Sequence, residues 1–250
     1  MGHYLKGMHP ASSPALFHSV LEDMIMKGAK GFLISGGCSP DGSIPLEPFV
    51  PEIQRIKEKY GAIVNMHVGI GSIRNVQTAA RCADIVSVEM VTDDRVLREV
   101  YGLAISSQKL LQFIEEINRS TVPFIAPHIT LGLYFGEMRG EYEALEHVAS
   151  LRCEKLIVNV LTPTKGTPME NISPPSIKEI EEFIAHAKNS LSVPLVLGCM
   201  RPRGPALEEA AVRGGAEGIV VPSPSTVRKY PGRKIEACCA VPTTLEERFY

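Results

Sequence analysis

The chain has 250 residues, of which 22% are charged, and a formal net charge of -2. This balance gives no electrostatic basis for binding nucleic acid. There is no apolar run of about 18 residues, and the first residues lack the charged-then-apolar order of a signal peptide. Six scattered cysteines favour reduced thiols. We therefore predict a cytoplasmic protein with no membrane or nucleic-acid partner.

Short β-type runs alternate with helical patterns along the whole chain. The runs are almost continuously apolar, as in parallel strands buried on both faces. The predicted strands span 31–35, 62–67, 84–89, 122–128, 155–160, 193–198 and 218–221. The predicted helices span 14–27, 45–60, 73–82, 106–119, 141–151, 175–191 and 205–213. No linker separates these units, which predicts one α/β domain over 1–250 with a TIM-type (β/α) barrel.

The barrel is expected to be incomplete, because the first predicted element is a helix. Each helix of a (β/α) series normally follows the strand over which it packs. We therefore expect seven strands, with the first barrel strand missing or supplied by another chain. The alternative is an N-terminal helix that caps the bottom of the barrel. The open edge also leads us to expect pairing with a second copy of the chain, as a homodimer.

Six segments at the predicted strand ends resemble the radical S-adenosylmethionine enzymes, and within them the biotin-synthase-related branch. The segments are HYLKGMHPASSPALF, GFLISGGCSPDGSIPLEPF, AIVNMHVGI, DIVSVEMVTDDRVLREVYGL, VNVLTPTKGTPM and VPLVLGCMRPRG. The resemblance implies S-adenosylmethionine and a 4Fe–4S cluster held by a C-x-x-x-C-x-x-C run. That run is absent here. We expect an N-terminally shortened sequence whose extended form carries the cluster, or a degenerate member that has lost it.

The glycine pair after the first predicted strand is a candidate ligand-binding loop. Residues without a Cβ allow close approach of a ligand to the backbone, and Asp41-Gly42 is typical of a turn. The resemblance implies that Gly36 and Gly37 approach the amino group of S-adenosylmethionine, with Cys38 in place of an acidic residue. The alternative is that the two glycines only permit a tight turn.

Polar residues lie at the predicted strand ends, where barrel enzymes carry their catalytic groups. The resemblance implies that Asn65, His67, Ser87 and Glu89 contact the methionine carboxylate and the ribose hydroxyls. The other interpretation of the histidines is a buried imidazole bonded to a backbone carbonyl. The predicted cofactor-binding residues are Gly36, Gly37, Cys38, Asn65, His67, Ser87, Glu89, His128 and Asn159.

Three cations follow later strands and are the candidate catalytic residues. Lys165 lies in the turn of LTPTKGTPM, and Arg201 and Arg203 flank Pro202 in GCMRPRG. A guanidinium suits a carboxylate or phosphate, so the pair predicts a small anionic substrate. The alternatives are a solvated loop lysine and a surface ion pair.

The cysteines supply a further hypothesis about metals. Cys38 and Cys199 belong to predicted mouth loops and could hold an auxiliary cluster, while Cys238-Cys239 could fold over the barrel. No metal site is assigned to this chain beyond that hypothesis. Cys82 and Cys153 lie on helical patterns and are interpreted as core residues.

The leading functional prediction is a radical S-adenosylmethionine enzyme, or its barrel fragment, using 5′-deoxyadenosyl-radical chemistry on a small anionic substrate, with sulfur insertion as one outcome. The chain alone is expected to be inactive. One alternative is a non-redox lyase or aldolase, with a Schiff base on Lys165 or a metal held by His67, Glu89 and His128. The other alternative is a noncatalytic barrel.

Overall fold

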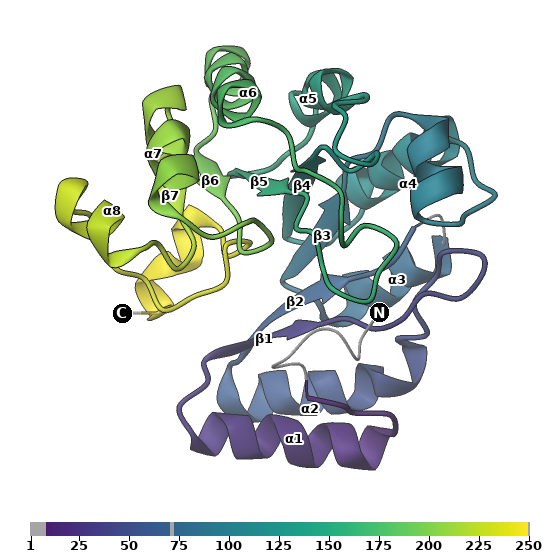
Figure 1. The fold of residues 1–250 in the computed structure, drawn as a ribbon. Coiled ribbons are helices and arrows are strands. Elements are labelled where there is room, and N and C mark those ends of the chain that lie inside the picture. Colours follow the sequence, from purple (N-terminus) through teal and green to yellow (C-terminus); the bar gives the residue numbers. More distant parts are fainter. Residues whose placement is uncertain (1–8, 71–72, 250) are drawn as a thin grey trace.

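The sheet forms an open, curled barrel of seven parallel strands in sequential order (Figure 1). The structure is a computed structural model and describes residues 9–70 and 73–249. Each strand pairs in parallel with the next, and the described residues include no ladder between β7 and β1. The strands are β1 (Gly31–Ile34), β2 (Ile63–His67), β3 (Ile85–Glu89), β4 (Phe124–Leu131), β5 (Leu156–Val160), β6 (Leu195–Leu197) and β7 (Gly218–Ile219). The predicted incomplete barrel is confirmed.

The helices lie on the convex side of the sheet (Figure 1). They are α1 (Pro14–Met26), α2 (Val50–Tyr60), α3 (Ile73–Cys82), α4 (Ser107–Arg119), α5 (Glu141–Val148), α6 (Ile177–Ser190), α7 (Pro205–Gly214) and α8 (Pro224–Lys229). Short helical segments are η2 (Glu47–Phe49), η3 (Val96–Val100) and η4 (Thr243–Phe249). In the described ranges, no helix has both the length and the apolar character needed to cross a membrane. The sequence did not predict α8, η3 or η4.

Local signals explain where several helices begin and end. Ser13 caps α1 by accepting from the Leu16 N–H, with proline as the first helical residue. Ser176 and Glu179 form a reciprocal capping box at the start of α6. Gly61 ends α2 in the left-handed conformation. These short-range interactions reproduce the predicted boundaries to within a few residues.

A second, smaller core lies on the concave side of the sheet. It joins inward-facing residues of β2–β5 to the segment after α8, which is yellow in Figure 1. Its buried members are Ile63, Ile85, Ala126, Ile157, Ala240, Val241 and Phe249. Lys155 Nζ also donates to Glu246 Oε1 at 2.7 Å, with both side chains largely buried. The segment 235–249 therefore forms an apolar floor inside the open barrel.

Replacing Gly69 with alanine should destabilise the fold, because two loops interlock there. Gly69 has a φ of +78°, and an added Cβ would lie 2.3 Å from the Gly42 carbonyl oxygen. Positive φ and this clash predict a loss of about 1–3 kcal/mol in the free energy of unfolding. Urea unfolding measures it, with Gly232→Ala as the control, since a Cβ there meets no atom within 4 Å. Equal stabilities of the two variants would contradict this prediction.

Candidate functional site

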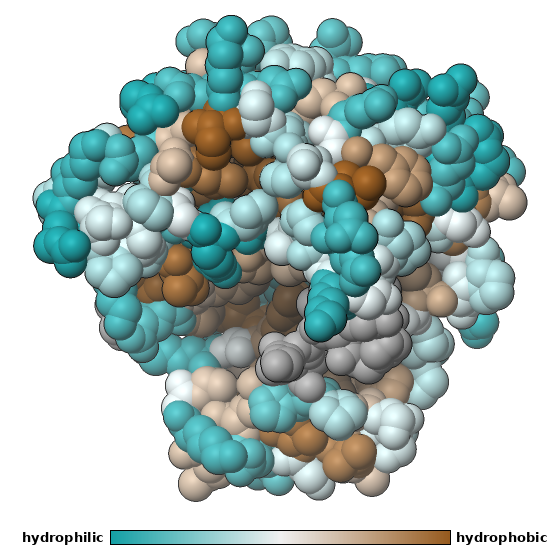
Figure 2. Space-filling model, viewed as in Figure 1, coloured by the Kyte–Doolittle hydropathy of each residue, from teal (hydrophilic) through white to brown (hydrophobic). Residues whose placement is uncertain are grey.

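The inward faces of β2 to β5 change from apolar to polar along each strand. On β2 the inward residues are Ile63, Asn65 and His67. Of these three, only Ile63 packs against the apolar floor. The same order recurs on the three following strands, because alternate residues of a strand share one face. The polar inward residues are Asn65, His67, Ser87, Glu89, His128, Thr130 and Asn159. Figure 2 shows the same view in space-filling form, with hydrophobic residues gathered in a recess near the centre.

Two amides inside the barrel carry unused hydrogen-bonding atoms. Ser87 Oγ donates to Asn65 Oδ1 at 3.0 Å, whereas Asn65 Nδ2 and Asn159 Oδ1 are buried without a partner at hydrogen-bond distance. A Cβ on Gly198 would lie 2.1 Å from Asn159 Oδ1, so the glycine gives this amide its space. Buried polar atoms are normally satisfied. One free donor and one free acceptor therefore mark a place for a polar ligand.

Glu89 is held as a weak acid at the carboxyl end of β3. Thr130 Oγ1 donates to Glu89 Oε1 at 2.6 Å. Burial raises the pKa of Glu89 to about 7, although the Thr130 hydrogen bond acts in the opposite direction. The hydroxyl of Tyr101 is enclosed near both Glu89 and Cys38, and burial raises its pKa well above the usual value. Near neutral pH, a large fraction of Glu89 therefore carries a proton that it can donate.

The two histidines of the site are neutral neighbours, with ring centroids 5.8 Å apart. His128 Nδ1 donates to the Ala126 carbonyl at 2.9 Å, which leaves Nε2 as an acceptor. Burial, then the adjacent His67, lowers the pKa of His128 to about 4, and burial lowers the pKa of His67. His128 thus has the backbone-carbonyl partner that is expected of a buried structural histidine. Its ring nevertheless lies next to that of His67.

The loop after β1 places the predicted glycine pair at the carboxyl end of the sheet. A Cβ on Gly37 would meet no atom within 4 Å, whereas one on Gly36 would lie 3.1 Å from Ile44 Cγ2. The predicted turn is present: Gly42 N–H donates to the Ser39 carbonyl at 2.8 Å. Cys38 is exposed, and it is near enough to the Tyr101 hydroxyl to affect its pKa. The backbone at Gly37 is thus open to a ligand.

Arg201 does not reach the mouth of the barrel, which corrects the expectation drawn from the GCMRPRG segment. Its side chain is 0% exposed and pairs with Glu208 at 3.0 Å. It also donates to the Gly198 carbonyl at 2.6 Å. Because α7 packs back beside β6, the carboxylate seven residues later takes the guanidinium. Arg201 is committed to the fold in this structure.

The other two predicted cations differ from Arg201 and from each other. Arg203 is exposed and donates to the carbonyls of Val220 and Cys199 at 3.1 and 3.0 Å, which links the ends of β6 and β7. Lys165 is exposed in the loop after β5. Of the three predicted catalytic residues, Lys165 alone has no hydrogen bond among the described residues.

The described residues contain no group of three or more His, Cys, Asp or Glu side chains placed to hold a metal ion. The alternative metal site of His67, Glu89 and His128 therefore finds no support in the geometry. Within the same described ranges, no such group includes Cys38 or Cys199, the residues of the auxiliary-cluster hypothesis.

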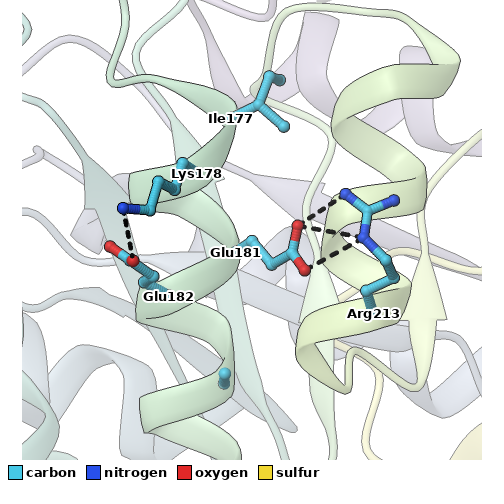
Figure 3. Close-up of a pocket in the computed structure, with 6 residues that line it drawn as sticks. Ile177, Lys178, Glu181, Glu182 and Arg213 are labelled. Carbon is cyan, nitrogen blue, oxygen red and sulfur yellow. Dashed lines mark hydrogen bonds and ion pairs between the residues drawn. The ribbon is translucent and has the colours of Figure 1, made fainter.

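Two cavities on the described surface differ in kind. A groove of about 570 Å³ between α6 and α7 is lined by exposed ion pairs, Lys178–Glu182 and Glu181–Arg213 (Figure 3). A cavity of about 880 Å³ lies between β1 and the segment 235–249, and Asn65 and Cys238 both line it. Of the polar inward residues named above, Asn65 is the one that lines this second cavity.

Comparison with curated proteins finds a similarity over part of the chain. The chain is 40% identical to the biotin synthase of Cenarchaeum symbiosum (strain A) over 91 residues, which cover 34% of the chain and 28% of that enzyme. No protein-family model matches the sequence. Over those 91 residues the chain is similar to biotin synthase. The predicted resemblance is confirmed.

Two solved structures share the fold of the chain. HydG, a maturase of the FeFe-hydrogenase, matches with a TM-score of 0.63 at 14% identity, over 86% of this chain and 50% of HydG. Methylornithine synthase (PylB) matches with a TM-score of 0.56 at 15% identity, over 94% of this chain and 71% of that one. These matches show a common fold.

The structure adds site residues that the sequence analysis missed. Thr130 was overlooked because the fourth strand was predicted to end at His128, whereas β4 continues to Leu131. Extending the inward–outward alternation of the strand by two residues beyond His128 would have identified Thr130. Tyr101 follows the π-helical segment η3 and gave no periodic signal. Asn65 and Cys238 line the same cavity although they lie far apart in the chain, which no local pattern reveals.

Proposed function

We propose that the chain forms the S-adenosylmethionine- and substrate-binding barrel of a radical S-adenosylmethionine enzyme. The observation that carries the proposal is the neutral polar cluster at the carboxyl ends of the strands. Glu89, His67 and His128 meet there inside an open parallel barrel, which is where barrel enzymes bind ligands. Sequence relationship to biotin synthase supports the same class of cofactor.

The residues present fit S-adenosylmethionine. Asn65 Nδ2 and Asn159 Oδ1 offer a free donor and acceptor, and Gly37 leaves its backbone open. These groups suit the amino, carboxylate and hydroxyl groups of such a ligand. When bound, S-adenosylmethionine would supply the 5′-deoxyadenosyl group for hydrogen abstraction.

The residues present do not fit a 4Fe–4S cluster. The 250 residues contain no C-x-x-x-C-x-x-C run, and the described part contains no group of side chains placed for a metal. A cluster would need cysteines from outside these residues. The proposal for this chain is therefore ligand binding and orientation.

The side chains have distinct tasks in this proposal. Protonated Glu89, oriented by Thr130, donates a hydrogen bond to a ligand oxygen. His128 Nε2 accepts, because its other nitrogen is held by the Ala126 carbonyl. The apolar floor excludes water from below.

We further propose a small substrate for which Lys165 supplies the positive charge. Arg201 is paired with Glu208 and Arg203 with carbonyls, so the exposed Lys165 is the predicted cation that can meet a substrate carboxylate. A Schiff-base role for Lys165 is disfavoured, because catalytic amines of that kind are desolvated. Sulfur insertion stays a prediction.

Calorimetric titration of the chain with S-adenosylmethionine tests the proposed function. We expect saturable binding that Asn65→Ala and Glu89→Ala each weaken by roughly 10- to 150-fold, since a hydrogen bond to a charged group contributes about 1.5–3 kcal/mol. Glu181→Ala, in the separate groove of Figure 3, is the matched control and should bind as the unaltered chain does. Circular dichroism confirms that each variant is folded.

The noncatalytic alternative predicts a different result. No saturable binding by the folded chain at millimolar S-adenosylmethionine would overturn the proposal. Equal binding by the chain and by both site variants would move the ligand to another surface and would overturn it as well.

A further inference from the structure

Thr130 holds one oxygen of the Glu89 carboxyl and leaves the other without a partner. Glu89 and His128 are register partners on β3 and β4, and Thr130, two residues after His128, projects from the same inward face. Thr130 Oγ1 donates to Glu89 Oε1 at 2.6 Å. Among the described residues, Glu89 forms no other hydrogen bond and no ion pair, and it is partly exposed. Oε2 is therefore the oxygen that a ligand can meet.

The titratable groups around Glu89 provide no positive charge. His128 Nδ1 donates to the Ala126 carbonyl at 2.9 Å, and the His67 ring lies 5.8 Å from the His128 ring. Burial lowers the pKa of both imidazoles and raises the pKa of the Tyr101 phenol, so all three are neutral near pH 7. An ionised carboxyl without a cation is costly in such surroundings. In agreement, the pKa of Glu89 is raised to about 7.

We propose that Thr130 is a positioning residue, which by holding Oε1 directs the protonated Oε2 of Glu89 to the ligand, so that the site binds an accepting ligand oxygen only while Glu89 keeps its proton. The inference rests on the proposed function and adds the regulation of that site by pH. A carboxylate or a carbonyl is the matching ligand group, because each offers an oxygen that accepts. Loss of the proton replaces the donor with a negative charge that repels the same oxygen.

The direction of the pH effect follows from proton linkage. Above pH 7 most of the free site is ionised, so binding takes up one proton at Glu89 Oε2 and the affinity falls by up to about tenfold per pH unit. The Thr130 hydrogen bond lowers the pKa of Glu89, since it stabilises the ionised form. Removing the Thr130 hydroxyl therefore moves the fall in affinity to higher pH. A purely structural role of Thr130 in the packing of β4 would leave that pH unchanged.

Calorimetric titration with S-adenosylmethionine from pH 6 to 9 tests the coupling. Glu89→Gln is the reference, because an amide can donate at all these pH values and the dependence that remains is that of the ligand. The affinity of the unaltered chain, divided by that of Glu89→Gln, should fall by roughly 100-fold between pH 6 and 9. Titrations in two buffers at pH 8 should show an uptake of about one more proton per bound ligand by the unaltered chain than by Glu89→Gln.

The positioning role is tested by Thr130→Val, which keeps the shape of the side chain and removes its hydroxyl. It should raise the midpoint of the fall in affinity by about one pH unit and weaken binding several-fold at pH 6. Thr130→Ser restores the hydroxyl and should restore both values. Thr78→Val is the matched control, because it removes a Thr78–Glu47 hydrogen bond of the same length, 2.6 Å, between α3 and η2. Circular dichroism confirms that each variant is folded.

The outcomes separate this inference from the proposed function. If neither the chain nor Glu89→Gln binds S-adenosylmethionine at any pH, the proposed function fails, and this inference fails with it. If both bind and their affinity ratio is the same at pH 6 and 9, the pH coupling is overturned while the proposed function stands. An unchanged midpoint in Thr130→Val would likewise overturn the role of Thr130.

Discussion

Replacing Glu208 with alanine should lower the free energy of unfolding by about 3–5 kcal/mol, because it leaves the Arg201 guanidinium buried without its counterion. Glu208 Oε1 accepts from Arg201 at 3.0 Å, and Oε2 accepts from the Ser223 N–H at 2.8 Å. The two side chains are 0% and 1% exposed. One substitution thus removes the partners of a charge in the loop after β6 and of an amide before α8. Urea unfolding followed by circular dichroism measures the loss.

The control for this experiment is an ion pair on the molecular surface. Glu181→Ala breaks the Arg213–Glu181 pair of Figure 3, whose closest contact is 2.6 Å but whose arginine side chain is half exposed. An exposed pair contributes about 0–1 kcal/mol, so this variant should differ little from the unaltered chain.

A double substitution distinguishes the effect of the Arg201–Glu208 ion pair from the effect of side-chain volume at this site. Arg201→Met with Glu208→Leu should recover most of the lost stability, since apolar residues can replace a buried ion pair. Equal losses for Glu208→Ala and Glu181→Ala would contradict the structural role assigned to Arg201.

Glu89→Gln should make the protein more stable at alkaline pH, although it removes a residue of the candidate site. The pKa of Glu89 is about 7 in the folded chain, against an ordinary value of 4.5. A carboxyl that holds its proton more tightly when folded contributes stability below pH 4.5, and that contribution falls as pH rises to 7. The difference corresponds to about 3 kcal/mol above pH 7. Glutamine keeps an acceptor for Thr130 and carries no charge.

The contribution of His128 has the opposite sign over the same range. Its pKa falls from 6.5 to about 4 on folding, so its contribution is lost as pH drops from 6.5 to 4. Glu89 and His128 therefore compensate each other between about pH 4.5 and 6.5 in the unaltered chain. The difference between Glu89→Gln and the unaltered chain isolates the carboxyl.

Thermal and urea unfolding from pH 4 to 9 checks this prediction. The two stability curves should coincide near pH 4 and separate progressively up to about pH 8, with Glu89→Gln the more stable. Glu143→Gln, on the exposed face of α5, is the control and should follow the unaltered curve. Curves that stay parallel at all pH values would show that Glu89 titrates normally.

The order and type of the barrel elements could be predicted from local pattern alone. Continuous apolar runs identified all seven strands, because a parallel strand buried on both faces leaves this signal within a few residues. The ends were less accurate: the fourth strand was predicted at 122–128 but spans Phe124–Leu131. The position of Asn65, Ser87 and Glu89 at the carboxyl ends of predicted strands also indicated that they share one cavity, since the ends of parallel strands meet at one edge of the sheet.

Partners between distant elements were decided by the tertiary structure. GCMRPRG predicts two arginines at a mouth, but only the packing of α7 against β6 shows that Glu208 takes Arg201. Only the return of residues 235–249 into the barrel places Val241 and Phe249 against Ile63 and Ile85. The physical reason is that period and turn chemistry act within a few residues. Charge pairing, burial and pKa depend instead on which surfaces meet in space.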